Sequence, residues 1–154
     1  MSDSEQTVTG IEVPIYLQYT FTAGTALTRF LTSIVEGRIV GQRCPGCANV
    51  YVPPRGSCPR CGLPTDEEVE VKDHGYIESF TIVHIPIPGN PIKPPFIAAN
   101  IRLDGADIAC LHLVSEVENE RVHVGMPVRA VWKPREEWGY TFENIAYFKP
   151  SEGA

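Results

Sequence analysis

The sequence lacks the segments that carry a protein into or across a membrane. Its apolar runs fall far short of the ~20 residues that a transmembrane helix needs. Residues 1–6 contain neither the basic region nor the apolar region of a secretory signal. We therefore expect a globular, cytoplasmic protein with no membrane partner, whose cysteines are kept reduced.

Positive charge is also scarce. The chain of 154 residues has a formal net charge of −6 and a pI near 5.2. Proteins that bind the phosphate backbone of nucleic acids usually have a basic surface and a high pI. The composition therefore argues against a nucleic-acid partner.

Motifs of common nucleotide-binding and catalytic sites are missing as well. Neither G-x-x-x-x-G-K-[ST] nor G-x-G-x-x-G occurs in the sequence. No nucleophile, base and orienting group form a recognisable local pattern. The four histidines are expected to be structural or surface residues; they are His74, His84, His112 and His123. We therefore expect no catalytic residues in this chain.

Cysteine, in contrast, is concentrated in one short window. Two C-x-x-C pairs with ten residues between them comprise Cys44, Cys47, Cys58 and Cys61. Turns that contain Pro or Gly can point both sulfurs of such a pair at one ion, so the two pairs predict a tetrahedral Cys₄ site. Zinc is the expected ion, and iron is the alternative because the same turns can hold it. Two disulfides could use the same cysteines, but they do not suit a reducing compartment.

The predicted metal site has a structural role. Ordering each residue of the window costs ~1–2 kcal/mol of backbone entropy, and Val50, Tyr51 and Val52 are almost its only apolar material. Zinc binding to four thiolates supplies roughly 10–16 kcal/mol in small peptides. Four sulfurs also fill the coordination sphere and leave no position for water or substrate. The fifth cysteine, Cys110, lies in an apolar run and is expected to be buried and inert.

The segment around the cysteines is the one basic stretch of the chain. Residues 38–64 contain four arginines and neither Asp nor Glu. Four thiolates on a divalent ion would leave this stretch with a charge of only about +2. An acidic run, which includes Asp66 and Glu67, follows it directly.

One amphipathic helix is predicted before the cysteines. Leu27, Phe30, Leu31, Ile34 and Val35 share one helical face. With Thr25 as N-cap and Gly37 at the C-terminal stop, the helix covers residues 25–37. Its apolar stripe either packs on its own domain or docks on a partner protein.

The N-terminal region, residues 1–24, has a different apolar pattern. Ile15, Leu17, Tyr19 and Phe21 alternate with more polar residues. This alternation predicts an extended arm or an edge strand.

The second half of the chain is expected to be β-structure. Five β-rich stretches cover residues 76–85, 96–103, 108–114, 122–132 and 141–148. Asp104-Gly105 is a turn between the second and third of them. Five short strands favour an OB-fold barrel over residues 72–150, because a sandwich usually has seven strands. Residues 151–154 are a tail, and the chain as a whole is mostly β.

A proline-rich connection joins the first two predicted strands. Five prolines lie between His84 and Phe96 and exclude a central strand. The stiff, apolar loop either covers the open end of the barrel or binds a partner or ligand through Ile87, Ile92 and Phe96.

From about residue 23 to 150 the sequence resembles a family of OB-fold proteins with an N-terminal rubredoxin-like zinc ribbon. The resemblance rests on Arg29-Phe30-Leu31, Glu36-Gly37-Arg38 and Gln42-Arg43-Cys44 in the helix and ribbon entry, on Cys58 to Gly62, and on residues 75–84, 94–96 and 124–128 of the barrel. Leu31 stands where many members of the family have tryptophan. Phe30 is the helix residue that we expect to contact a partner. Because Leu31 replaces the tryptophan, this contact could differ from that of the family.

This family implies a non-catalytic subunit of a thiolase-like acyl-CoA complex. Its members pair with thiolase or sterol-carrier-type aldolase subunits, on which the chemistry takes place. The approach to the helix, Tyr19 to Gly24, resembles the branch whose partners cleave CoA thioesters of steroid side chains by a retro-aldol reaction. The resemblance thus implies a zinc ribbon over residues 38–65 that helps to assemble or shape a partner's active site.

Two other functions remain open. A stand-alone acyl-CoA binding module would use Arg43, Arg55, Arg60 and Lys93 for the CoA phosphates, with Phe96 in the proline loop as a contact. An OB-fold that binds single-stranded nucleic acid would stack bases on Tyr76, Phe80 and Phe96.

Overall fold

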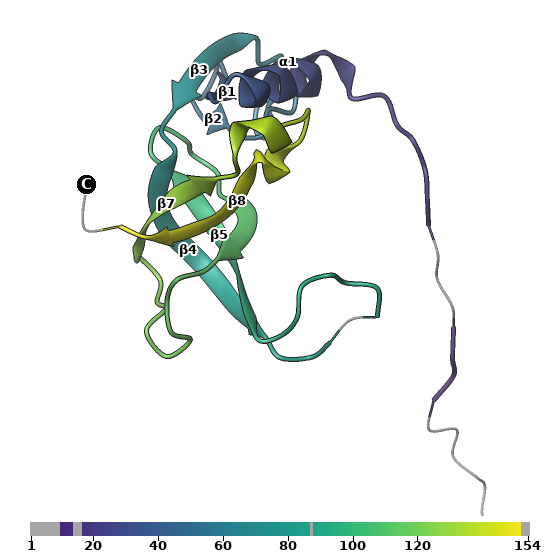
Figure 1. The fold of residues 1–154 in the computed structure, drawn as a ribbon. Helices are drawn as coiled ribbons and strands as arrows, with labels where there is room; N and C mark the ends of the chain where they lie inside the picture. Colours follow the sequence, from purple (N-terminus) through teal and green to yellow (C-terminus); the bar gives the residue numbers. More distant parts are fainter. Residues whose placement is uncertain (1–9, 14–16, 87, 152–154) are drawn as a thin grey trace, which may run out of the picture.

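The computed structural model describes residues 10–13, 17–86 and 88–151. Ile15 of the predicted arm, Ile87 of the predicted loop and most of the two tails lie outside the described residues. One helix is followed by two β-sheets (Figure 1). The elements are α1 (Gly24–Val35), β1 (Ile39–Arg43), β2 (Val50–Tyr51), β3 (Glu67–Val71), β4 (His74–Val83), β5 (Phe96–Leu103), β6 (Cys110–Val114), β7 (Pro127–Trp132), the 3₁₀ turns η1 (Arg135–Glu137) and η2 (Phe142–Asn144), and β8 (Ile145–Pro150).

The second sheet is a closed five-stranded barrel with the order β4-β5-β6-β8-β7. Its neighbours are antiparallel except β6 and β8, which are joined by one parallel pair, Val114 with Phe148. Alternate residues of β5 point inward, and Ile97, Ala99 and Ile101 are buried. The arrangement confirms the predicted OB-fold.

The strand boundaries differ most from the prediction at two places. The fourth predicted stretch contributes a strand only from Pro127 onward, and β8 begins at Ile145 because residues 142–144 form a 3₁₀ turn. The predicted turn after β5 is present, with Gly105 at a φ of 95°. At the start of β4, a Cβ on Gly75 would lie 2.0 Å from the carbonyl oxygen of Arg102, so only glycine allows this close approach of β4 to β5.

The first sheet, β2-β1-β3, contains a strand that the sequence analysis did not predict. The acidic stretch after the cysteines returns as β3 and pairs antiparallel with β1, which places Glu67 opposite Arg43. Arg43 Nε lies 3.1 Å from a carboxylate oxygen of Glu67. Arg38 and Arg29 make further ion pairs with β3, at 3.5 Å to Glu70 and 3.7 Å to Glu68. Much of the basic charge of this region is therefore compensated within the sheet.

Helix α1 packs on its own domain. Phe30 and Ile34 are 1% and 0% exposed, and the ring of Phe30 lies 5.7 Å from that of Phe142. The expected partner contact through Phe30 is thereby corrected, because its ring lies inside the core. Thr25 is not the N-cap either; the helix already begins at Gly24, and Ala23 caps it without a side-chain hydrogen bond. The stop at Gly37 is as predicted, with a φ of 83°.

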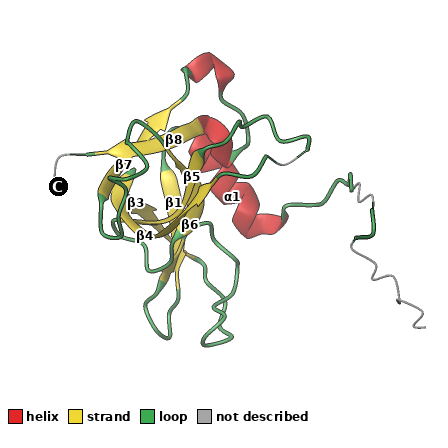
Figure 2. Ribbon diagram, turned by 90° about the horizontal axis from the view of Figure 1, so that it is seen from below, coloured by secondary structure: helices red, strands yellow, loops and turns green. Residues whose placement is uncertain are grey.

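The described residues of the N-terminal region before Gly24 belong to no helix or strand. It runs away from the strands, beyond the N-terminus of α1 (Figure 2). Of the two expected forms, the structure has the extended arm and not the edge strand.

In the part of the chain that the structure covers, no helix has the length and apolarity to cross a membrane.

The barrel core gives a direct test of the fold. Phe148 on β8 is 0% exposed, so Phe148→Ala is expected to lower the free energy of unfolding by about 3–5 kcal/mol. Chemical denaturation measures the change. Tyr140→Ala, at a side chain that is 72% exposed, should change stability by no more than about 0.5 kcal/mol. Equal effects of the two substitutions would contradict the position of Phe148.

Candidate functional site

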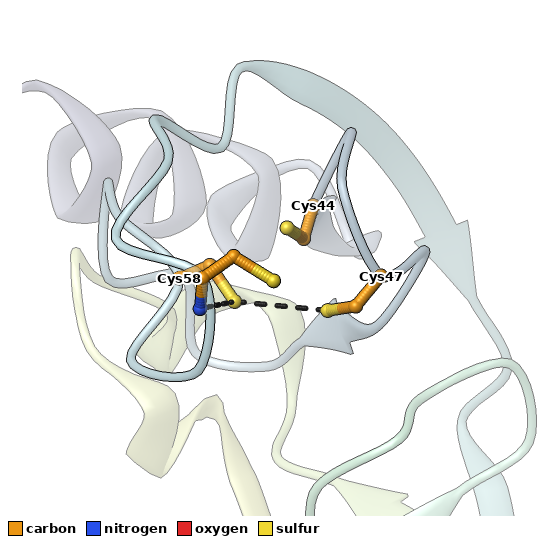
Figure 3. Close-up of side chains that lie close together, drawn as sticks. Cys44, Cys47 and Cys58 are labelled. Atoms are coloured by element: carbon orange, nitrogen blue, oxygen red, sulfur yellow. Dashed lines mark hydrogen bonds between the residues drawn. The ribbon is translucent and has the colours of Figure 1, made fainter.

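The four cysteines of the ribbon meet at one point. Their sulfur atoms all lie within 4.8 Å of one another. The sulfurs of Cys47 and Cys58 are 3.7 Å apart, and a tetrahedral ion with Zn–S bonds of ~2.3 Å separates its ligands by about 3.8 Å. Figure 3 shows the side chains of Cys44, Cys47 and Cys58 turned toward a common centre. The donor set therefore fits a single tetrahedral metal ion.

Two similar turns hold these sulfurs. In each turn, the carbonyl of the first cysteine accepts a hydrogen bond from the N–H four residues later, and its sulfur accepts one from an N–H inside the turn. The carbonyl bonds are Ala48 N–H to Cys44 O and Gly62 N–H to Cys58 O, and the sulfur bonds, both 3.3 Å, are Gly46 N–H to Cys44 Sγ and Cys61 N–H to Cys58 Sγ. N–H groups aimed at the sulfurs stabilise their thiolate form.

Each turn ends on a residue in the left-handed backbone region. Gly62 has a φ of 70°, which glycine adopts easily. Ala48 occupies the equivalent position of the first turn with a φ of 62°, although residues with a side chain seldom adopt this conformation. The backbone of the first turn is therefore strained to keep the sulfur arrangement.

A tyrosine on β2 contacts the cysteine cluster. The hydroxyl of Tyr51 lies 3.2 Å from Cys58 Sγ. This hydrogen bond is the main reason that the pKa of Cys58 falls to about 6, while the pKa of Tyr51 rises to about 12. The hydrogen bond to Cys47 raises the pKa of Cys61 to about 12. The thiolate form is thus favoured at Cys58 and disfavoured at Cys61. A bound cation would stabilise the thiolate form of both.

Strand β2 faces two different clusters. Val50 and Val52 are buried in the main core together with the barrel residues. Tyr51, between them, points to the opposite side and packs with Cys44 and Cys58. Because side chains of an extended segment alternate in direction, three consecutive residues link the cysteine cluster to the core.

The connection between β5 and β6 is also joined to this strand. The N–H of Asp107 donates to the carbonyl of Val50 at 3.0 Å, and a carboxylate oxygen of Asp107 accepts from the Val50 N–H at 2.8 Å. Ile108 packs against the cysteine cluster. Neither residue was predicted as part of the site; the sequence indicated only the turn at 104–105 and a β-stretch from residue 108 in this connection.

Comparison with known proteins agrees with this architecture. The model of the "ChsH2, rubredoxin-like zinc ribbon domain" matches residues 34–65, and that of the "ChsH2, C-terminal OB-fold domain" matches residues 68–133. A DUF35 domain-containing scaffold protein of Methanocaldococcus jannaschii is 31% identical over 117 residues, which cover 70% of this chain and 82% of that protein. The chain belongs to the DUF35 family.

Other similar proteins differ in length or are more distant. The DUF35 chain is 30% identical over 97 residues to a probable enoyl-CoA hydratase alpha subunit of Thermomonospora curvata, a match that covers 63% of this chain but only 30% of that protein. Two solved structures, each 24% identical, share the fold. The "Ltp2-ChsH2(DUF35) aldolase" has a TM-score of 0.59, with 79% of this chain and 91% of the other covered. A DUF35 protein of unknown function from Sulfolobus solfataricus has a TM-score of 0.62, with 83% and 87% covered.

The cationic contacts that the sequence suggested do not converge in this DUF35 protein. Arg43 is paired with Glu67, whereas Arg55 and Arg60 are exposed on the ribbon and make no ion pair with any described residue. Lys93 and Phe96 lie at the connection of β4 and β5, which extends from the other end of the barrel (Figure 1). A single phosphate site built from these residues is therefore not present in the structure.

The proposed stacking face for nucleic acid is also incomplete. Arg102 lies over the ring of Tyr76, 6.0 Å from its centre, and Phe80 is partly buried against the core. Phe96 is partly buried at the start of β5.

An apolar groove of about 450 Å³ lies where β6 and β8 diverge. Its walls come from the proline loop, β6, η2 and β8, and include Ile92, Leu111 and Phe142. The side chain of His112 lines this groove. Its Nδ1 accepts the Leu113 N–H at 2.9 Å, and its ring contacts that of Phe142 at 5.3 Å. Burial lowers the pKa of His112 below its ordinary value.

The partly buried His112 side chain is expected to make the protein less stable in acid. Its pKa in the folded state lies below the ordinary value, so the unfolded chain binds more protons as the pH falls through ~6.5. The free energy of unfolding should therefore decrease between about pH 7.5 and 5. Denaturant titrations across this range should show a smaller decrease for His112→Gln than for the unchanged protein. The exposed His84→Gln serves as the control and should leave the slope unchanged.

The Tyr51 hydroxyl is expected to strengthen metal binding. Tyr51→Phe keeps the buried ring and removes the hydrogen bond to Cys58 Sγ. Groups that hydrogen-bond to a metal ligand usually contribute about 10–100-fold in affinity. Competition with a chromogenic chelator should therefore show zinc binding weakened by this factor. Tyr140→Phe, far more exposed, is the control, and an unchanged affinity of Tyr51→Phe would contradict the assigned contact.

Proposed function

We propose that this DUF35 protein is a non-catalytic scaffold subunit of an acyl-CoA-processing complex, in which a thiolase-like subunit performs the reaction. The observation that carries the proposal is the match to the scaffold protein of M. jannaschii, of which the chain covers 82%. The cysteine site supports it, because four converging sulfurs leave a bound ion no open position for a substrate.

The nature of the partner is inferred from the names of similar proteins. One is called an Ltp2-ChsH2(DUF35) aldolase and another an enoyl-CoA hydratase alpha subunit. We infer that the partner is an aldolase that cleaves CoA thioesters of steroid side chains by a retro-aldol reaction in the cytoplasm. The resemblance of the segment from Tyr19 to Gly24 to the steroid-specific branch of the family supports this choice.

We infer that the ion is zinc and that its role is structural. It would be held by Cys44, Cys47, Cys58 and Cys61. The bound cation would allow all four cysteines to ionise and would fix both turns. Through Tyr51 and Asp107 it would also fix the position of the ribbon relative to the barrel.

A second candidate function, acyl-CoA binding, is favoured by the groove at His112. Its apolar walls suit an acyl chain, and Lys133 lies on its border. Lys93 and Phe96, in and next to the proline loop, and Arg55 and Arg60 on the ribbon remain proposed contacts to CoA or the partner. Calorimetric titration of the isolated protein with an acyl-CoA tests this candidate, and no heat at high ligand concentration would reject it.

Co-expression with a thiolase-like aldolase subunit tests the scaffold proposal. The two chains are expected to co-purify, with about one zinc per DUF35 chain by elemental analysis. Thioester cleavage should require the partner and should be absent from the DUF35 chain alone. Cys58→Ser should abolish the soluble complex, whereas Ser57→Ala, in the same turn, should preserve it. Full partner activity without this chain, or turnover by this chain alone, would refute the proposal.

A further inference from the structure

The N-terminal arm, defined here as the described residues 10–13 and 17–23, exposes a regular row of apolar side chains. Leu17, Tyr19 and Phe21 are 76%, 69% and 66% exposed, and Ile11 and Val13 are 81% and 67% exposed. These positions are all odd-numbered, which is the period of one face of a β-strand. The rings of Tyr19 and Phe21 lie 6.3 Å apart, as expected for neighbours on the same face of an extended chain.

Such a surface is unusual for a protein that acts alone. Contiguous exposed apolar side chains commonly mark a protein interface. Glu12 is the only charged residue from position 10 to 23, although the whole chain carries −6. The arm leaves the body at the N-terminus of α1 and extends away from both sheets (Figure 1). It is therefore placed to contact a second molecule.

The ribbon sheet of a second copy does not offer a suitable acceptor. Its free edges are β2 and β3. Strand β2 has two residues, both buried. Strand β3 carries Glu67, Glu68 and Glu70, all exposed, and charged side chains at an edge discourage the addition of an apolar strand.

The barrel offers no suitable acceptor either. It is closed, and its one weak seam lies between β6 and β8, which are paired only at Val114 and Phe148. In this seam the N–H of Leu113 is already bonded to His112 Nδ1. Among the described strands of this chain, none presents an open, apolar edge long enough for the arm.

We propose that the arm binds the catalytic partner subunit as an added β-strand, with Leu17, Tyr19 and Phe21 inserted into an apolar groove beside an open sheet edge of that subunit. The inference rests on the proposed scaffold function and adds the surface that makes the contact. Main-chain hydrogen bonds would supply affinity, and pockets for alternate side chains would supply specificity. The partner's groove is expected to be apolar and nearly uncharged, in keeping with the arm.

The size of the arm is sufficient for this role. A standard interface buries roughly 800 Å² on each partner, and each large aromatic side chain can bury roughly 150–250 Å². Tyr19 and Phe21 alone could therefore provide about half of this area. Buried aromatic residues are also frequent among the side chains that dominate binding energy.

The test compares two faces of the same segment in the full-length chain. Tyr19→Asp/Phe21→Asp places two charges on the apolar row, and Thr20→Asp/Thr22→Asp places the same two charges on the opposite face. Affinity for the purified thiolase-like subunit is measured by surface plasmon resonance. The first variant should bind about 100-fold more weakly or worse, and the control should stay within about threefold. Both should keep the melting temperature of the unchanged chain, and hydrogen exchange of residues 17–22 should slow in the complex.

Any other outcome would overturn the inference that the arm binds the partner. Equal weakening by both variants would indicate a charge effect, and unchanged binding of the first would exclude the arm. A lower melting temperature of the first variant would mean that the arm packs on its own fold. A dimer of the unchanged chain that only the first variant dissociates would make a second copy the occupant. These results leave the scaffold function standing, whereas failure of the unchanged chain to bind the subunit would refute both proposals.

Discussion

The arrangement of the molecule depends on three consecutive residues, two in β2 and one just after it, whose side chains alternate in direction. Val50 and Val52 enter the main core, whereas Tyr51 reaches the cysteine cluster. The two hydrogen bonds between Val50 and Asp107 then tie the same strand to the barrel. Contacts of residues 50–52 therefore join the cysteine turns to the barrel.

The parts of the fold that the sequence predicts are those with a local signal. The helix was predicted from its 3.6-residue period, β5 from its run of β-forming residues, and the cysteine turns from their spacing. Strand β3 was missed because its glutamates suggest a solvated loop; in the fold these glutamates make ion pairs with arginines of α1, of β1 and of the turn between them. Phe30 was expected at a partner surface because the apolar face of a helix looks the same in sequence whether it packs inside or outside.

The contacts around the cysteine cluster could not be predicted, because they join distant parts of the chain. Asp107 and Val50 are 57 positions apart, and the sequence carries no sign that they pair. Tyr51 looked like ordinary core material until the structure placed its hydroxyl at Cys58. For the four basic residues proposed to bind CoA, the sequence shows the charge but not the position of each side chain in the fold. Their charge was correctly read from the sequence, but Arg43 is paired with Glu67 within the ribbon and Lys93 lies in the connection between β4 and β5.

The proposed scaffold role would require this protein to contribute shape and not reactivity. A divalent ion closed by four sulfurs has no site for a substrate, and ion pairs within the ribbon sheet compensate part of its basic charge. Exposed apolar side chains remain in the arm, and apolar side chains line the groove at His112. Apolar contact is non-directional and needs a complementary surface to become specific. A partner with its own shaped groove would supply that specificity, so in the proposed complex recognition would depend on geometry more than on charge.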